Sequence, residues 1–467
     1  MALLSNSMSR NVLSLCGGII LSIVLNGLLN SCSCICNNNT PTTSTNGYVD
    51  NLEKFHSAYF MQGINGIKYD KLALYVDCST CIAMGQQSPF FQSLIPCWVN
   101  ATKEYYSIKG SEIVKEEDDT FSLLRSIKEV NYADLKTAVE MMAKSDHESV
   151  LLTDGEYYQQ SIAKGNINNP YMANAFKEWL KKGHDIYFLT EPYVESNNGQ
   201  CFNKKRFYIL FTDTRLKGNI YDRIMQTVDL SLYKDVDIFH LSADHPSLLA
   251  EGNSSTVNAN LNASVKGFGN MEVQDWPISW EEGIEPLVVN AVDPNTGNAL
   301  PNGDFISKGI KVDRNSFGGY RIKDVNCKVY NINGFFTEFS DAIENKQKIG
   351  GNIDLSTCQS DNFIVVNSKE FERHGIIELH FDVQFFYPKP VLDGTPYNYT
   401  KVDICISKVE YLFNRYKDVF TFDSIDMPGD KNVSVAASIE QCLTAPDIKN
   451  QILNCPVYSF YIRSMER

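Results

Sequence analysis

Short apolar runs alternate along the chain with segments whose apolar residues recur at helical spacing. Runs rich in β-branched and aromatic residues predict strands at 71–77, 103–109, 111–116, 149–154, 185–190, 206–213 and 235–242. Helical spacing is found between them, at 132–144 and 169–182. This alternation predicts that residues 67–250 form an α/β domain, a doubly wound and mostly parallel sheet covered by helices. The turn at Lys109 and Gly110 separates two adjacent runs and predicts one antiparallel edge strand.

The pattern changes beyond that domain. Residues 251–264 are polar and predict a linker. After them, short β-rich runs are separated by Gly, Asn, Pro and Asp, and in 377–384 apolar residues alternate with polar ones, which is typical of a strand with one buried face. A helical pattern is concentrated at 438–453. We therefore predict that residues 265–467 form an all-β region, packed as an immunoglobulin-like sandwich.

The N-terminal segment has the pattern of an export signal. A single charge, Arg10, precedes a mostly apolar run at 12–29 that is short for a membrane span, so residues 1–31 are predicted to be a signal peptide. The segment ends in Leu-Asn-Ser-Cys at Cys32, which resembles a bacterial lipoprotein cleavage box. The resemblance implies lipidation of Cys32; an ordinary cleaved signal and an uncleaved anchor are the alternatives. Residues 32–66, rich in Asn, Thr and Pro at their start, are predicted to be a flexible tether.

Charge, cysteine usage and missing motifs narrow the function classes. The 467 residues have a formal net charge of −14, which makes a nucleic-acid backbone an unsuitable partner. Thirteen cysteines are present, and the nine beyond residue 36 are scattered rather than arranged as a disulfide framework. The chain contains no G-x-S-x-G, G-x-x-x-x-G-K-[ST], H-E-x-x-H or G-x-G-x-x-G motif, so we do not expect an enzyme of the common hydrolase or nucleotide-binding classes.

Two of the predicted strands end in carboxylates. The run at 71–77 ends at Asp77 and is followed by Ser79 and Cys81, and the run at 149–154 ends at Asp154, with a glycine directly after it. Ligands of open α/β sheets bind outside the carboxyl ends of the strands. If both strands belong to one parallel sheet, Asp77 and Asp154 lie at the same edge.

The order of these elements carries a family resemblance. A strand, a D-x-S-x-C turn, a helix, an edge hairpin, a second helix and a strand ending in T-D-G together resemble a von Willebrand factor type A domain. In that family a D-x-S-x-S turn, a loop threonine and the aspartate of T-D-G form a metal-ion-dependent adhesion site that usually holds Mg²⁺. The resemblance implies that Asp77, Ser79 and Asp154 are metal ligands. It also implies a protein partner, whose acidic side chain completes the shell of the ion.

The sequence departs from the family at two ligands. Cys81 stands where the family has serine, and a soft thiol is a poor ligand for Mg²⁺. Ala133 lies near the position of the family's threonine, with Asp134 beside it as a further candidate ligand. An extra segment at 192–213 is predicted to be a hairpin added to the fold.

These observations predict a lipoprotein of the cell envelope, either periplasmic or at the cell surface. A lipid anchor would hold it to a bacterial membrane, and its von Willebrand A-like domain would bind a protein partner with the help of a divalent metal. One alternative is a glycan-handling accessory protein whose β-rich region binds carbohydrate through exposed aromatic residues. Aromatic residues more commonly fill the cores and edges of β-sandwiches, and this use is favoured for the residues concerned: Phe335, Phe336, Phe339, Phe385, Phe386, Tyr387, Tyr397 and Tyr399. Another alternative is an enzyme acting at the Asp77/Asp154 edge.

The cysteines of the D-x-S-x-C turn allow two further interpretations. Cys78 and Cys81 form a C-x-x-C pair after a strand and before a helix, as in thioredoxin-like oxidoreductases, although a directly preceding aspartate would raise the thiol pKa. Alternatively, Cys78 or Cys81 forms a structural disulfide, with Cys97 as a candidate partner.

Overall fold

The main sheet of the protein is a mixed, seven-stranded one. The computed structural model describes residues 46–60, 68–117, 124, 133–157, 167–214, 216, 218–244, 257–259, 263–265, 269–271, 287–288, 304–315, 318–349, 353–359, 364–382 and 397–465. The predicted signal peptide and Cys32 lie outside these residues. Every helix in the described part is too short or too polar to cross a membrane.

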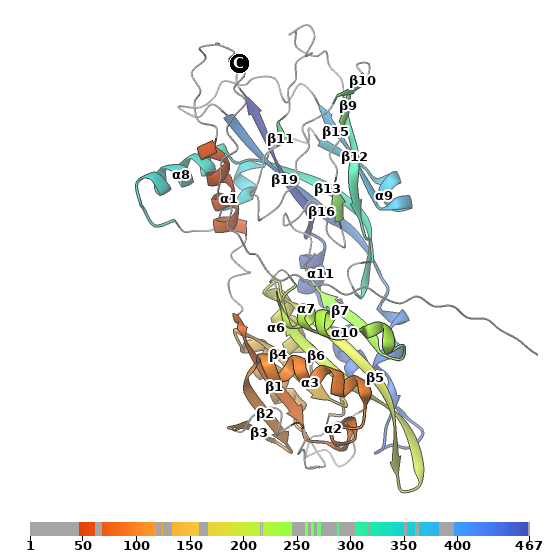
Figure 1. The fold of residues 1–467 in the computed structure, drawn as a ribbon. Coiled ribbons are helices and arrows are strands. Elements are labelled where there is room, and N and C mark those ends of the chain that lie inside the picture. Colours follow the sequence, from red (N-terminus) through yellow and green to blue (C-terminus); the bar gives the residue numbers. More distant parts are fainter. Residues whose placement is uncertain are drawn as a thin grey trace, which may run out of the picture. The chain divides into compact units, whose positions relative to one another are not determined.

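The strands of the main sheet follow the order β3-β2-β1-β4-β6-β5-β7 (Figure 1). They are β1 (Lys68–Asp77), β2 (Thr102–Lys109), β3 (Glu112–Glu116), β4 (His147–Thr153), β5 (Asp185–Asn197), β6 (Gln200–Thr212) and β7 (Asp237–Ser242). Strand β1 pairs in parallel with β2 and β4, whereas the other four pairings are antiparallel. The α/β class and the antiparallel edge strand β3 are therefore confirmed. The mostly parallel arrangement holds only for β2, β1 and β4.

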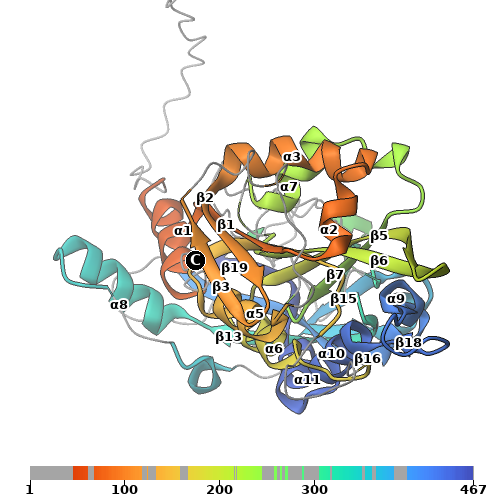
Figure 2. The ribbon, with the colours of Figure 1, turned by 90° about the horizontal axis from the view of Figure 1, so that it is seen from below.

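Helices cover both faces of this sheet. They are α2 (Thr80–Gly85), α3 (Pro89–Ala101), α5 (Leu135–Lys144), α6 (Ala173–Lys181) and α7 (Ile220–Thr227). Alternate residues of β1 point to opposite sides: Leu74 packs in one core with Trp98 of α3, and Tyr75 packs in the other with Trp179 of α6. Figure 2 shows α2, α3 and α7 on one face and α5 and α6 on the other. Burial on both faces explains why the strands are almost continuously apolar.

The predicted extra hairpin is present, but it is part of the sheet rather than an addition to it. Strands β5 and β6 are joined at Asn198 and Gly199, whose φ values of +50° and +77° suit a two-residue hairpin turn. Strand β6 lies between β4 and β5 in the sheet. This central position suits its apolar residues from Phe207 to Phe211, which are all buried on the two faces of the sheet. Strand β7 pairs with β5 only up to Thr190, so the outer part of the hairpin projects past its neighbours (Figure 1).

Within the part of the C-terminal region that the structure describes, the strands form three smaller sheets. Six strands form the first: β8 (Val257–Ala259), β9 (Ala263–Val265), β10 (Gly269–Met271), β12 (Asp304–Val312), β14 (Ile364–Asn367) and β15 (Ile376–Asp382). The second contains β11 (Leu287–Val288), β13 (Tyr320–Asn331), β16 (Tyr397–Tyr411) and β19 (Pro456–Met465), and the third β17 (Phe422–Asp423) and β18 (Lys431–Asn432). Strands β8 and β9 pair with β12, so part of the predicted linker at 251–264 belongs to a sheet.

The prediction that residues 265–467 are all-β is wrong. Four helices occur there: α8 (Asn333–Glu344), α9 (Ser368–His374), α10 (Ser434–Thr444) and α11 (Pro446–Ile452). The last two coincide with the helical pattern noted at 438–453. They pack on α6 of the main sheet, where Met172 N donates to Ser438 Oγ at 3.2 Å and Gln451 Nε2 donates to Leu180 O at 2.9 Å. The chain from Asn46 onward accordingly forms one compact unit.

The prediction of a flexible tether at 32–66 is wrong for residues 46–60, and the rest of that range lies outside the described residues. Residues Asn46–Phe60 form helix α1, in which Leu52 and Phe55 are completely buried. The ring of Phe55 lies 5.6 Å from that of Phe336 and 5.4 Å from that of Phe339, both in α8. His56 Nδ1 lies 2.6 Å from the hydroxyl of Tyr461 in β19. The helix is held by apolar packing and by a buried hydrogen bond.

Candidate metal centre

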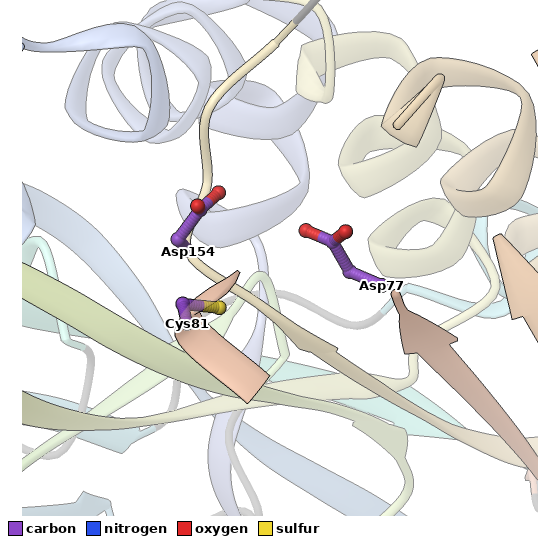
Figure 3. A group of neighbouring side chains, drawn as sticks. All are labelled: Asp77, Cys81 and Asp154. Carbon is purple, nitrogen blue, oxygen red and sulfur yellow. The ribbon is translucent and has the colours of Figure 1, made fainter. Parts of the chain in front are cut away.

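Asp77, Cys81 and Asp154 converge at one edge of the main sheet. Asp77 is the last residue of β1, Cys81 lies in the first turn of α2, and Asp154 directly follows β4. One potential ligand atom from each residue lies within 4.8 Å of those from the other two. Figure 3 shows the two carboxylates and the sulfur approaching a common space. The exposed fractions are 1% for Asp77, 0% for Cys81 and 8% for Asp154, so the group is nearly closed to solvent.

The parallel pairing of β1 and β4 brings the two aspartates together. Val76 pairs with Leu152, so the next residues, Asp77 and Thr153, are neighbours at the ends of their strands. Thr153 Oγ1 donates to Asp77 Oδ2 at 2.8 Å and accepts from Gly155 N at 3.0 Å. The threonine therefore holds the carboxylate of Asp77 and the T-D-G turn in a fixed relation.

A glycine is required directly after Asp154. Gly155 has φ +74°, and a Cβ built there would lie 2.7 Å from Cγ2 of Val435 and 2.9 Å from Cε2 of Phe207. Any other residue would be strained in this conformation and would also clash with α10. Glu156 N donates to Asp154 Oδ1 at 2.9 Å, which fixes one oxygen of this carboxylate. The T-D-G motif thus depends on both the local turn and the packing of a distant helix.

Ser79 lies beside the group, as the family resemblance implied. It precedes α2, but its side chain does not cap the helix. Instead, its Oγ lies 3.1 Å from Cys81 Sγ. The main-chain oxygen of Cys81 accepts hydrogen bonds from Arg206 Nε at 2.9 Å and from Arg206 Nη2 at 2.8 Å. Cys81 is therefore held through both its side chain and its backbone.

Burial and mutual repulsion dominate the electrostatics of the group. Burial, followed by the negative charge of Asp154, raises the pKa of Asp77 well above its usual value, and the hydroxyls of Thr153 and Ser79 oppose that rise. Burial and the two nearby carboxylates likewise raise the pKa of the Cys81 thiol well above its usual value. Two carboxylates at this distance thus favour either a proton or a cation between them.

A partly buried ion pair borders the group on the side of Asp154. Lys204 Nζ, on β6, lies 2.5 Å from Glu156 Oε1. Burial and then the charge of Asp154 raise the pKa of Glu156 to about 7, although Lys204 acts in the opposite direction. Lys204, Glu156, Thr153 and Arg206 are not among the site residues predicted from the sequence. The signal was the alternation of Lys204, Arg206, Tyr208 and Leu210, which places two basic residues on an otherwise apolar strand face.

Asp134 is not part of the group. Its carboxylate accepts hydrogen bonds from Thr137, from N at 3.4 Å and from Oγ1 at 3.0 Å, and caps α5. Ala133, near the position of the family's threonine, is buried and pairs with Gly110. Among the described residues, neither Ala133 nor Asp134 therefore supplies the ligand that the family takes from its loop threonine.

The structure contradicts the predicted disulfide and places some of the aromatic residues that were considered for carbohydrate binding. All nine cysteines beyond residue 36 are free thiols, so the disulfide predicted for Cys78 or Cys81 is absent. Cys78 lies outside the three-residue group, with its Sγ 3.8 Å from Val76 O. Of the aromatic residues considered for carbohydrate binding, Phe336, Phe339 and Tyr399 are buried in the core. Phe385, Phe386 and Tyr387 lie outside the described residues.

The donor set fits a divalent cation, with one exception. Asp77 Oδ1 is buried and has no hydrogen-bond partner among the described residues, as expected for an oxygen that faces a cation. Two carboxylates and the hydroxyl of Ser79 suit a hard ion such as Mg²⁺. The thiol of Cys81 does not, because sulfur ligands favour softer ions.

Fold and site define a mixed α/β protein with a buried group of two carboxylates and one thiol at the edge of its main sheet. Comparisons with known proteins add no family: no protein-family model, curated protein or solved structure matches the chain.

Proposed function

We propose that this protein binds a protein partner through a divalent cation held by Asp77, Ser79 and Asp154 in a von Willebrand A-like domain. The observation that carries the proposal is the convergence of Asp77 and Asp154 from two parallel strands, together with a buried oxygen of Asp77 that has no hydrogen-bond partner among the described residues. Strand β6 lies within the sheet where the family has no such strand, so the likeness rests on β3, β2, β1, β4 and the site they support.

Such a site supports binding rather than bond chemistry. The protein side chains fill only part of an ion's shell, and a carboxylate from a partner can supply a missing ligand. Asp154 is more exposed than Asp77 and Cys81, Ser79 is partly exposed, and the neighbouring side chain of Glu156 is 31% exposed. A partner would therefore approach past Ser79, Asp154 and Glu156.

The same proposal places the protein in a bacterial cell envelope, held by lipid at Cys32. Helix α1 shortens the tether that this arrangement would use. Residues 33–45, which are 13 in number, would separate the anchor from Asn46, the first residue of α1. Fully extended, such a segment spans at most roughly 45 Å. The folded unit would thus remain close to the membrane surface.

Metal-dependent stabilisation tests the site. The full chain is unfolded thermally in chelator and then with magnesium, manganese or zinc chloride. We expect at least one ion to raise the unfolding midpoint, because an ion that binds only the folded state stabilises it. Asp77→Asn should abolish the rise, whereas Asp134→Asn, which changes a nearby aspartate outside the group, should retain it. An equal rise in both variants would remove the proposed site.

Partner binding is tested with the same variants. The wild-type chain, bound to a solid support, is incubated with intact cells in the presence of the stabilising ion or of chelator. We expect retention that depends on the ion and is lost in Asp77→Asn but not in Asp134→Asn. Retention of cells that is equal with the ion and with chelator, and equal in the wild type and Asp77→Asn, would overturn the adhesion mechanism.

A further inference from the structure

We infer that Cys81 is itself a ligand and that the centre selects Zn²⁺ over Mg²⁺. This inference rests on the proposed cation site and specifies the ion it takes. It also gives a function to Cys81, one of the two positions at which the sequence departs from the ligand set of the von Willebrand A family.

Cys81 is placed as a ligand would be. Its side chain is completely buried, its sulfur belongs to the three-atom group with the two carboxylates, and it is a free thiol. Asp77 Oδ1, which is also buried, has no hydrogen-bond partner among the described residues. Two observations therefore point to the same space: a converging set of ligand atoms and an oxygen whose bonding capacity is unused.

The backbone of Cys81 is held in place from the opposite side. Arg206 donates two hydrogen bonds to its main-chain oxygen. A Cβ built at Gly85 would lie 2.8 Å from Arg206 Nε, so the helix turn and the guanidinium are in close contact. This clamp limits rotation of the first turn of α2 away from the carboxylates, and the sulfur stays directed at the site.

The ligand chemistry distinguishes the two ions. Zinc accepts thiolate sulfur together with carboxylate oxygen, usually in tetrahedral geometry, whereas magnesium requires oxygen ligands in a near-octahedral shell. Ligand atoms in a tetrahedral zinc site are roughly 3.5 Å apart. Because the three ligand atoms here all lie within 4.8 Å of one another, they would have to approach one another by about 1 Å at most. On binding, a sulfur–zinc bond forms and the thiol proton passes to solvent. With Asp77, Cys81 and Asp154 as the zinc ligands and the hydroxyl of Ser79 beside the sulfur rather than on the ion, the fourth position remains for water or for a ligand from the partner.

Zinc and magnesium affinities of the purified full chain test the inference. They are measured by calorimetry for the wild type, for Cys81→Ser, which restores the family's residue, and for Cys201→Ser, which removes an exposed thiol elsewhere. In the wild type we expect zinc to bind at least about tenfold more tightly than magnesium. Cys81→Ser should lose about tenfold or more in zinc affinity and gain magnesium binding, while Cys201→Ser behaves as the wild type.

Cobalt(II) provides a direct signature of the sulfur ligand. Cobalt bound by a thiolate shows a near-ultraviolet charge-transfer band, which we expect in the wild type and in Cys201→Ser but not in Cys81→Ser or Asp77→Asn. If Cys81→Ser does not fold, the wild-type band and its displacement by zinc, compared with Asp77→Asn, decide the matter.

The outcomes separate the inference from the proposed function. Magnesium binding that is tighter than zinc binding, or a zinc preference unchanged in Cys81→Ser, overturns the inference and leaves the proposed site intact. If no ion binds in a way that depends on Asp77, both the inference and the proposed function are overturned.

Discussion

Arg206 donates two hydrogen bonds to the main-chain oxygen of Cys81, from Nε at 2.9 Å and from Nη2 at 2.8 Å. Its third nitrogen, Nη1, donates to Glu191 Oε2 at 2.6 Å, an oxygen that also accepts from Tyr208 at 2.8 Å. The inserted strand β6 thus binds the turn between β1 and α2 with a nearly buried cation. Because this turn carries Ser79 and Cys81, the geometry of the candidate centre depends on β6.

Replacing Arg206 by leucine should strongly destabilise the protein. Glu191 would stay in a mostly buried position without its cation, and the oxygen of Cys81 would lose both donors. Removal of one partner of a buried ion pair costs about 3–5 kcal/mol, which we expect as the loss in unfolding free energy measured with urea. Lys205→Leu, which changes the adjacent, partly exposed cation, should alter it by less than about 0.5 kcal/mol. Similar losses in both variants would contradict the clamp.

Asp77→Asn should stabilise the protein in chelator. Its carboxylate is buried, faces Asp154 and leaves Oδ1 unpartnered, whereas an amide keeps the oxygen that accepts from Thr153 and removes the repulsion. We expect a gain of about 1 kcal/mol or more in unfolding free energy. Asp134→Asn should change the unfolding free energy by less than about 0.5 kcal/mol, because asparagine caps a helix N-terminus about as well as aspartate.

This pair of variants has a second use when the stabilising ion is added. With the ion present, the wild type and Asp134→Asn should be more stable than Asp77→Asn, the reverse of the order in chelator. The reason is that only they retain the two carboxylates that hold the ion. A loss of stability for Asp77→Asn in chelator would show that the ionised carboxylate supports the fold by itself, which would argue against a cation between the two aspartates.

The part of the site that was predictable is the part encoded locally. A strand followed directly by Asp77, and a T-D-G turn after another strand, could each be recognised within ten residues, and parallel pairing of neighbouring strands brought them together. The position of β6 could not be predicted in this way. Its pairing with β4 joins residues such as Thr153 and Phe207, and such long-range pairing leaves no local pattern. Lys204 and Arg206 were missed for this reason.

Helix α1 was missed although a local signal existed. Leu52, Phe55 and Tyr59 are spaced three and four apart, which is typical of a helix with one apolar face. The Asn- and Thr-rich composition of the preceding residues obscured it. Correct assignment of α1 would also have required knowledge of the residues that pack against it. Those residues, Phe336 and Phe339 of α8, are distant in the sequence.

Asp185 should make the stability of the protein fall in acid. Burial opposes its ionisation, but the hydrogen bond and charge of His240, 2.8 Å away, together with Thr214, lower the pKa of Asp185 to about 2. Because this folded-state pKa lies below the unfolded value, ionised Asp185 stabilises the fold above about pH 4, and that contribution is lost as the pH falls toward 2.

Urea unfolding between about pH 2 and pH 7 measures this effect. Asp185→Asn should be less stable than the wild type by roughly 2 kcal/mol at neutral pH and should show a shallower decline toward acid. Glu178→Gln, which removes an exposed carboxylate on α6, should follow the wild-type profile. Parallel profiles for Asp185→Asn and the wild type would exclude Asp185 as a source of the acid sensitivity.

Helix α1 should detach more readily as the pH falls below about 6.5. Burial, followed by the positive charge of Lys401, lowers the pKa of His56 well below its usual value, so the docked helix holds His56 neutral against the hydroxyl of Tyr461. Once α1 is undocked, His56 regains its ordinary pKa and takes up a proton, and the docked state therefore loses stability as the pH falls through that value.

Hydrogen exchange of residues 46–60, corrected for intrinsic rates, should be faster at about pH 5 than at about pH 7.5. In His56→Gln, which preserves a hydrogen-bonding side chain but does not titrate, the difference should disappear. Equal protection of wild-type α1 at the two pH values would rule out this histidine as the cause.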